Sequence, residues 1–300
     1  ENINAPDRIK EEIDEKIGRN HIMSKNVNKK IGIYILAGII LLVIIIAISV
    51  IATGKKVPQS GEVSNPTFTD EDGKVYVAAF LKEMTEGLQR HKKAFSCQAK
   101  MLQFHDREKM DDGGNYYCAL GWAFAGGKEK SAKHYDKEKK IFSSCAGAAI
   151  YRKKIFEKIG YFDDEHFAYL EDLDVGYRAR IYGYENWYIP GAVVYHVGSG
   201  TSGSRYNQFK IRYSSRNNIY MIYKNMPFLQ IILNLPFLLV GFGMKILFFC
   251  LKGYGREYLA GIKNGFQLSV KGRKVPFSLK HFPAYCKIQW ELWVNIFRRF

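Results

Sequence analysis

Three carboxylates lie close together in the sequence at Glu171, Asp172 and Asp174, and two arginines, Arg178 and Arg180, follow them. If a helix begins near Glu171, then Glu171, Asp174 and Arg178 share one face, and Asp172 projects from another. Asp172 is then available for the chemistry of a carboxylate, which is proton transfer or cation binding. The alternative is purely structural, because exposed N–H groups in the first turn of a helix attract acidic side chains.

The segments on both sides of this acidic cluster carry a recognisable pattern. Residues Cys145–Arg152 (CAGAAIYR) and Phe156–Asp164 (FEKIGYFDD) precede it, and Tyr188–Ser202 (YIPGAVVYHVGSGTS) follows it. In order and spacing, the whole series resembles the second half of family 2 glycosyltransferases of the GT-A fold. The likeness is closest to rhamnosyltransferase-like enzymes of bacterial surface-polysaccharide assembly. It covers roughly residues 68–290 and is strongest from about 92 to 227.

The resemblance implies an inverting sugar transfer, in which a carboxylate takes the proton of the acceptor hydroxyl as that oxygen attacks the anomeric carbon. Asp172 resembles that catalytic base, and Glu171 would orient or support it. Arg178 is a candidate ligand-binding residue, although with Asp174 it also fits a role in holding the helix. The leaving nucleoside diphosphate needs a divalent cation, Mg or Mn, or Lys and Arg to meet its negative charge.

The resemblance also implies a metal site. The family supplies it from an aspartate-containing motif ahead of a helix, and Asp70 and Asp72 occupy that place here; the alternative is a solvated acidic turn. His196 resembles the family position that approaches the metal or the diphosphate, and a structural histidine is the alternative. The glycine-rich segment that follows includes Ser199 and Gly200, where backbone N–H groups can approach phosphate oxygens.

Three further positions are candidates for sugar contact. Gly147 and Ala148 are small where the family's sugar site needs room, and Trp122 offers an apolar ring face. Small residues also serve close packing of strands, and tryptophan is often a core residue. Both interpretations are open for each position.

Composition limits the class of protein. The formal net charge is +16 and 47% of the residues are hydrophobic, which suits an anionic membrane surface or substrates that carry diphosphates. No nucleic-acid-binding signature accompanies the charge, so we expect no nucleic-acid partner. The five cysteines are odd in number and contain no CxxC pair, so the sequence indicates neither a disulfide framework nor a zinc site and favours reduced thiols in the cytosol.

Two segments indicate contact with a membrane. Residues 31–52 contain no charge and are flanked by lysines, which predicts a transmembrane helix rather than a cleaved signal peptide. Residues 228–251 are also apolar but contain Asn234, Pro236 and Lys245. This second segment fits a kinked span, helices lying in the membrane interface, or a hydrophobic hairpin packed on the core.

Between these segments the hydrophobic pattern alternates between helix and strand, which predicts an α/β fold: a partial GT-A domain with a Rossmann-like mixed sheet flanked by helices. Helices are expected over 76–89, 152–159 and 170–183, strands over 95–104, 142–151 and 186–196, a turn at 111–115, and a loop or hairpin over 116–140. The predicted regions are a charged tail (1–28), the transmembrane helix (29–54), a linker (55–68), the glycosyltransferase-like domain (69–227) and a membrane-associated helical region (228–300).

One part of the family pattern is missing, namely the initial strands that bind the nucleotide base and ribose. The sequence is therefore expected to be a fragment or to carry a different N-terminal region. The predicted function is a membrane-associated inverting glycosyltransferase that faces the cytoplasm and transfers a sugar from a nucleotide-sugar donor to a lipid-linked or polysaccharide acceptor. The alternative is a catalytically silent remnant that binds an acceptor or a partner.

Overall fold

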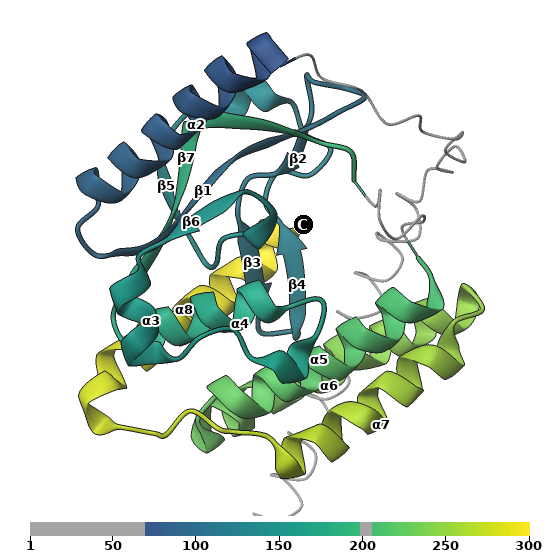
Figure 1. Ribbon diagram of the computed structural model, residues 1–300. Helices are drawn as coiled ribbons and strands as arrows, with labels where there is room; N and C mark the ends of the chain where they lie inside the picture. Colours follow the sequence, from purple (N-terminus) through teal and green to yellow (C-terminus); the bar gives the residue numbers. More distant parts are fainter. Residues whose placement is uncertain (1–69, 199–205) are drawn as a thin grey trace, which may run out of the picture. The chain divides into compact units, whose positions relative to one another are not determined.

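The computed structural model describes residues 70–198 and 206–300, with side chains from Phe80 onward (Figure 1). The predicted tail, transmembrane helix and linker, and also Ser199 and Gly200, lie outside the described residues. The described residues all lie in one compact unit. The helices after residue 227 therefore belong to the same unit as the domain that precedes them.

A mixed sheet forms the first layer. Its central strand, β1 (Ala94–Gln103), runs parallel to β7 (Glu185–His196) and antiparallel to β2 (Met110–Asp112) and β6 (Ala149–Tyr151). Strand β5 (Lys139–Ile141) pairs antiparallel with the other side of β7. All but the last residue of β1 are buried, as expected for a central strand covered on both faces.

Helices cover the sheet on both sides. Met84 of α2 (Asp70–Arg90) packs in a cluster with residues of β1 and β7, and Figure 1 shows this helix lying across the sheet. Phe95 of β1 instead packs with apolar residues of α3 (Lys153–Ile159) and α4 (Glu171–Ile181). The fold of the described residues is thus mixed α/β, which confirms the predicted class.

A two-stranded hairpin of β3 (Asn115–Cys118) and β4 (Trp122–Ala125) joins the sheet layer to the C-terminal helices. The backbone carbonyl of Tyr117 accepts a hydrogen bond from Asn295 at 2.8 Å, and that of Gly121 accepts one from Asn218 at 2.8 Å. Residues far apart in the sequence therefore converge on this hairpin.

The second layer is helical and consists of α5 (Gln208–Asn225), α6 (Phe228–Leu251), α7 (Gly255–Lys271) and α8 (Phe282–Arg299). Figure 1 shows α5, α6 and α7 side by side. A methyl group at Gly261 would lie 1.8 Å from Ser215 Oγ, so a glycine is required where α7 crosses α5. Close packing of this kind fixes α7 against α5 and leaves little freedom between them.

Most of the predicted elements are present, with shifts of a few residues, as α2, α3, α4, β1, β7 and the β3–β4 hairpin. The expected continuous strand over 142–151 is wrong. The chain leaves the sheet after Ile141 and forms a short 3-10 helix over Ala146–Ala148 before β6. The reason is local: the Ser143 backbone bonds to Asn115, and the Cys145 N–H bonds to the Gln98 side chain at 2.6 Å, so neither continues a ladder.

The predicted turn over 111–115 is only partly correct. Asp111 and Asp112 end β2, Asn115 begins β3, and the chain reverses only at Gly113 and Gly114. Gly114 has a φ of 113°, a conformation that an L side chain rarely adopts. The two adjacent aspartates are therefore held in the sheet, where their side chains have fixed partners.

The apolar segment 228–251 forms one uninterrupted helix, α6, with Pro236 inside it. Among the described residues, α6 is the one helix long and apolar enough to cross a membrane. Length and composition alone support that statement.

Candidate active site

A cavity of about 670 Å³ lies between the start of α4, the Cys145–Gly147 segment, the β3–β4 hairpin and helices α5 to α7. Both carboxylates at the start of α4, Glu171 and Asp172, line it. Three lysines also line it, and they come from three different parts of the chain: Lys128, Lys210 and Lys245. The remaining lining includes apolar and aromatic residues, among them Leu170, Ile211, Phe249 and Tyr258. The cavity therefore combines charged groups with apolar walls, as small-molecule sites do.

Asp172 is held by three hydrogen bonds to its carboxylate. Asn115 Nδ2 and the Ala146 N–H each donate to Oδ2 at 3.2 Å, and the Leu173 N–H donates to Oδ1 at 2.7 Å. The Ser143 hydroxyl donates to the Asp172 backbone carbonyl at 2.6 Å and so fixes the start of the helix. Donors from the hairpin, the small-residue segment and α4 thus meet at one carboxylate.

The environment of Asp172 favours its protonated form. Burial, followed by the negative charge of Glu171, raises the pKa of Asp172 to about 7, even though the two backbone N–H bonds lower it. Glu171 Oε2 is itself buried without a hydrogen-bond partner among the described residues. A carboxyl group with a pKa near neutrality can accept a proton and release it again at physiological pH.

The backbone leading into Asp172 is strained. Phe167, Tyr169 and Leu170 have φ values of 56°, 70° and 67°, which are uncommon for non-glycine residues. Asn217 of α5 holds the strained segment, because its Nδ2 lies 2.7, 2.7 and 2.8 Å from three backbone carbonyl oxygens, those of His166, Ala168 and Tyr169. Backbone strain of this kind often marks functional sites and persists only where surrounding structure fixes it.

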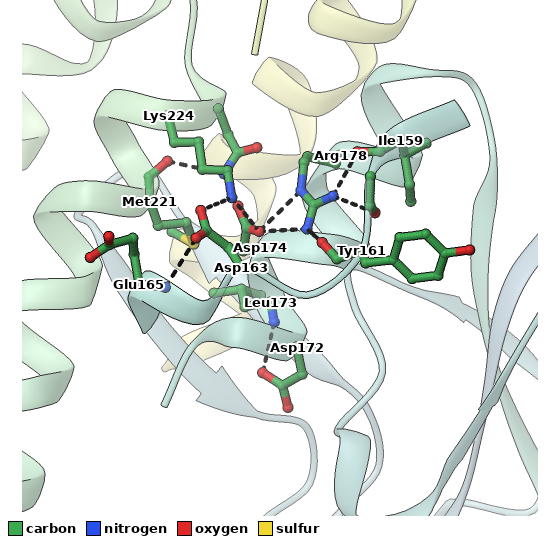
Figure 2. A network of polar contacts seen from close by, with 12 residues as sticks. Ile159, Tyr161, Asp163, Glu165, Asp172, Leu173, Asp174, Arg178, Met221 and Lys224 are labelled. Atoms are coloured by element: carbon green, nitrogen blue, oxygen red, sulfur yellow. Dashed lines mark hydrogen bonds and ion pairs between the residues drawn. The ribbon is translucent and has the colours of Figure 1, made fainter. Parts of the chain in front are cut away.

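Asp174 lies two residues after Asp172 but points away from it, as Figure 2 shows. Its Oδ2 accepts hydrogen bonds from Arg178 Nη2 at 2.8 Å and Lys224 Nζ at 2.9 Å, and its Oδ1 accepts one from Asn225 at 2.8 Å. Although burial opposes ionisation, the charges of Arg178 and Lys224 lower the pKa of Asp174. Asp174 is fully buried and belongs to the structure rather than to the cavity.

The Arg178 guanidinium makes all of its hydrogen bonds within the structure around Asp174. Besides Asp174, it donates to the backbone carbonyls of Ile159, Gly160 and Tyr161, as Figure 2 shows in part. Only 4% of its surface is exposed, and it does not line the cavity. Of the two roles considered for Arg178, its position supports the one in holding the helix.

His196 lies at the end of β7, and its Nδ1 is 2.7 Å from Asp111 Oδ2. Asp111 Oδ1 accepts a hydrogen bond from Lys128 at 2.7 Å, and Lys128 also lines the cavity. The hydrogen bond that the His196 ring makes to the Asp111 carboxylate raises the pKa of His196. Asp111 was not among the residues that the sequence singled out, although the Asp-Asp-Gly-Gly pattern was a usable signal.

The expected metal ligands are only partly described. Asp70 and Asp72 lie in the first turn of α2, and their side chains fall outside the description. Within the described residues, no group of three or more His, Cys, Asp and Glu side chains is arranged to hold a metal ion. His196 and Asp111 are an imidazole and a carboxylate in contact, which are suitable donors for Mg or Mn once further ligands join them.

The other predicted contact residues take different positions. Gly147 lines the cavity, and a methyl group there would approach nothing closer than 3.7 Å. Ala148 is buried in the cluster between α2 and β1. Trp122 is buried against α6, where its Nε1 donates to the Gly241 carbonyl at 2.9 Å, and it is not among the residues that line the cavity.

Comparison with protein-family models gives no match, and comparison with curated proteins gives none either. What can be inferred about this chain therefore depends on its residues and on the geometry of the Asp172 cavity.

Proposed function

We propose that this chain is a membrane-associated inverting glycosyltransferase of family 2, which transfers a sugar from a nucleotide-sugar donor to a lipid-linked or polysaccharide acceptor in bacterial cell-surface glycan synthesis. The main support is Asp172. Its carboxylate lines a cavity of about 670 Å³, and its pKa is raised to about 7. The segments around Asp172 also resemble the second half of that family.

In the proposed reaction, an acceptor hydroxyl oxygen attacks the anomeric carbon of the donor sugar. A new C–O bond forms as the bond from that carbon to the diphosphate breaks, and the nucleoside diphosphate leaves with the electron pair. The hydroxyl proton passes to the Asp172 carboxylate, which is the general base. Lys128 and Lys210 line the same cavity and offer positive charge to the diphosphate.

A divalent cation would help to neutralise the leaving diphosphate. Among the described residues, Asp111 and His196 are the groups that could hold it, because they lie in contact and Lys128 connects them to the cavity. Asp70 and Asp72 are the further candidates from the sequence.

Membrane association is supported by the two faces of α6. The four buried residues of α6 include two polar ones, Gln230 and Asn234, whereas its exposed residues are mainly large and apolar. Leu229 is 76% exposed, Leu239 67% and Leu251 72%. This pattern is the reverse of a helix on a water-soluble protein, where apolar side chains face inward.

Charge supports the same proposal. Residues 206–300 contain fifteen lysines and arginines but only two glutamates. An excess of basic residues beside an exposed apolar face is typical of segments that bind anionic lipid surfaces. We propose that the outer face of α6 rests in the lipid of a membrane, on its cytoplasmic side.

The proposal is tested with the full chain in detergent. Calorimetry with UDP and dTDP, with and without Mn²⁺, measures donor-side binding, and release of nucleoside diphosphate from nucleotide sugars measures turnover. Asp172→Asn is expected to bind nucleoside diphosphate as the wild type does but to lose roughly 10²–10⁴-fold in turnover. Asp164→Asn is the matched control, because Asp164 is an exposed carboxylate outside the cavity.

The alternative is a catalytically silent module that binds an acceptor without a donor. One observation favours it: the described part of the sheet contains a single parallel pair, β1 with β7, whereas nucleotide-binding α/β sheets have several parallel strands. Absence of nucleoside diphosphate binding at millimolar ligand would support this alternative and contradict the proposed transferase.

A further inference from the structure

The inner face of α6 contacts the rest of the protein along nearly the whole helix. Gln230 lies 3.3 Å from the Tyr177 hydroxyl, and Asn234 exchanges two hydrogen bonds with Gln289 of α8 at 2.7 and 2.8 Å. Two turns beyond Asn234, the Gly241 carbonyl accepts the hydrogen bond from Trp122. Gln230, Asn234 and Gly241 are separated by four and seven residues, which is one and two helical turns, so they lie on one face of the helix.

This arrangement limits how α6 meets a membrane. A methyl group at Gly241 would lie 1.9 Å from the Leu120 carbonyl oxygen, so the β3–β4 hairpin touches the backbone in the middle of α6. A helix covered by protein on one side along its length cannot be surrounded by lipid. It can lie in the plane of the membrane interface, with its apolar face toward the lipid and its inner face toward the cavity.

Lys245 lies on the inner face of α6 and lines the same cavity as Asp172. Its ammonium group lies 5.9 Å from the centre of the Trp122 ring, which is a cation–π contact. Among the described residues it forms no salt bridge with a carboxylate. An ionisable residue in an apolar membrane-facing helix is costly and usually has a functional partner.

The residues near Lys245 indicate what kind of partner it binds. Phe249, one turn further along α6, stacks with Tyr258 of α7 at 4.9 Å between ring centres, and both rings line the cavity. A ligand at Lys245 thus meets a positive charge beside apolar rings, on the side of the cavity formed by α6 and α7. A lipid phosphate matches both features, because it brings a negative charge to Lys245 and an attached apolar chain to the rings.

We infer that Lys245 binds the phosphate of a membrane lipid that carries the acceptor sugar, with the lipid chain along α6 and α7 and the sugar hydroxyl at Asp172. This inference rests on the proposed function and narrows its acceptor to a phosphate-linked glycolipid. It assigns Lys245 to binding the acceptor, not to proton transfer.

The test uses the full chain in nanodiscs of neutral phosphatidylcholine. Farnesyl diphosphate serves as the probe, farnesol as its uncharged counterpart, and inorganic pyrophosphate as the phosphate without a lipid chain. We expect farnesyl diphosphate to bind most tightly, and Lys245→Met to weaken that binding about tenfold or more. Binding of farnesol and of UDP or dTDP should stay unchanged. Lys252→Met is the matched control, because Lys252 follows the same helix but is exposed and outside the cavity.

Two further variants and one competitor complete the design. Lys245→Arg keeps the charge and should bind farnesyl diphosphate within about threefold of the wild type. Lys245→Gln should weaken that binding as Lys245→Met does, so the result does not depend on the folding of a single variant. Phosphatidylglycerol in the nanodisc should not displace the probe; if it does, the site binds ordinary lipid headgroups and the inference is overturned. Unchanged farnesyl diphosphate binding in Lys245→Met also overturns it.

The outcome can be separated from that of the proposed function. If nucleoside diphosphate binds but Lys245 has no effect on the lipid probe, the transferase stands and this inference fails. If Lys245→Met weakens nucleoside diphosphate binding instead, the lysine serves the donor and the inference is again wrong. If the lipid probe binds through Lys245 but no nucleoside diphosphate binds, the acceptor site stands and the transferase fails.

Discussion

Asp172 and Asp174 occupy the same turn of α4, yet their surroundings give them opposite properties. Asp174 is fully buried and surrounded by Arg178, Lys224 and Asn225, which lower its pKa. Asp172 lines a cavity beside another carboxylate, Glu171, and its pKa is raised to about 7. The difference teaches that position in the helix does not decide the role of a carboxylate. The number of cations and donors around it does.

Changing Asp174 should have the largest effect on the fold. Asp174→Asn leaves buried Arg178, which is 4% exposed, without a carboxylate partner, and leaves Lys224, which is 5% exposed, with Asp163 alone. Loss of one partner from a buried ion pair costs about 3–5 kcal/mol of the free energy of unfolding. Urea denaturation followed by circular dichroism measures this loss. An unchanged midpoint would mean that the network contributes nothing to stability.

Changing Asp172 should act in the opposite direction. Asp172→Asn removes a carboxylate that is costly to ionise in the folded protein, so it should raise the free energy of unfolding at pH 8 by on the order of 1–3 kcal/mol. Because the folded pKa of about 7 exceeds the unfolded value of 3.8, the wild type loses this stability as the pH rises from about 4 to 7. The gain in the variant should therefore vanish near pH 4. A pH series of thermal melts for both proteins checks this window.

The same pKa predicts the pH dependence of turnover. A general base must be deprotonated, so kcat/KM should fall about tenfold per pH unit below pH 7 and level off above it. Rates of nucleoside diphosphate release, measured from about pH 5.5 to about pH 9, give the profile. A flat profile across pH 7 would show that Asp172 is not the base.

Stability should respond to acid in a separate window. Although burial opposes ionisation, hydrogen bonds from Lys224 and Tyr220 lower the pKa of Asp163 to about 2. Its contribution is present above the unfolded value of 3.8 and is lost as the pH falls toward 2. Lys224 pairs with both Asp163 and Asp174, so acid unfolding of this network should begin well below the pH at which turnover stops. If acid unfolding and the loss of turnover occurred at the same pH, the assignment of Asp163 to stability and of Asp172 to turnover would be contradicted.

Gly147→Ala should have the smallest effect. Its added methyl group would lie 3.7 Å from the nearest side-chain atom, in ordinary contact, so the free energy of unfolding should change by less than about 0.5 kcal/mol. Because Gly147 lines the cavity, the effect should appear instead in the KM of the proposed sugar transfer. A large loss of stability with an unchanged KM would show that the glycine serves packing alone.

The α/β class and most elements could be predicted because their hydrophobic patterns are local. The pairing of Asp174 with Arg178 was also predictable, since it depends on helical spacing alone. The roles of Lys224, Asn217 and Asn115 were not predictable, because each reaches Asp172, Asp174 or the segment before them from a distant part of the chain. Lys245 looked like an interruption of an apolar segment, and only the packing of α6 directs it to the cavity.

The strand between Ile141 and Ala149 was mispredicted for a related reason. Side chains and backbone from elsewhere take the hydrogen bonds that a strand here would use, among them Gln98 and Asn115. The same departure from regular structure brings the Ala146 N–H to Asp172. The site and the irregular backbone therefore have one cause.

The contact between Asn295 and the Tyr117 carbonyl joins residues 178 positions apart in the sequence. During synthesis, the β3–β4 hairpin leaves the ribosome well before α8 does, so the Tyr117 carbonyl meets its Asn295 partner only after α8 has emerged. The hairpin, whose Asn115 and Ala123 line the Asp172 cavity, therefore gains this anchor only after the intervening chain has been made.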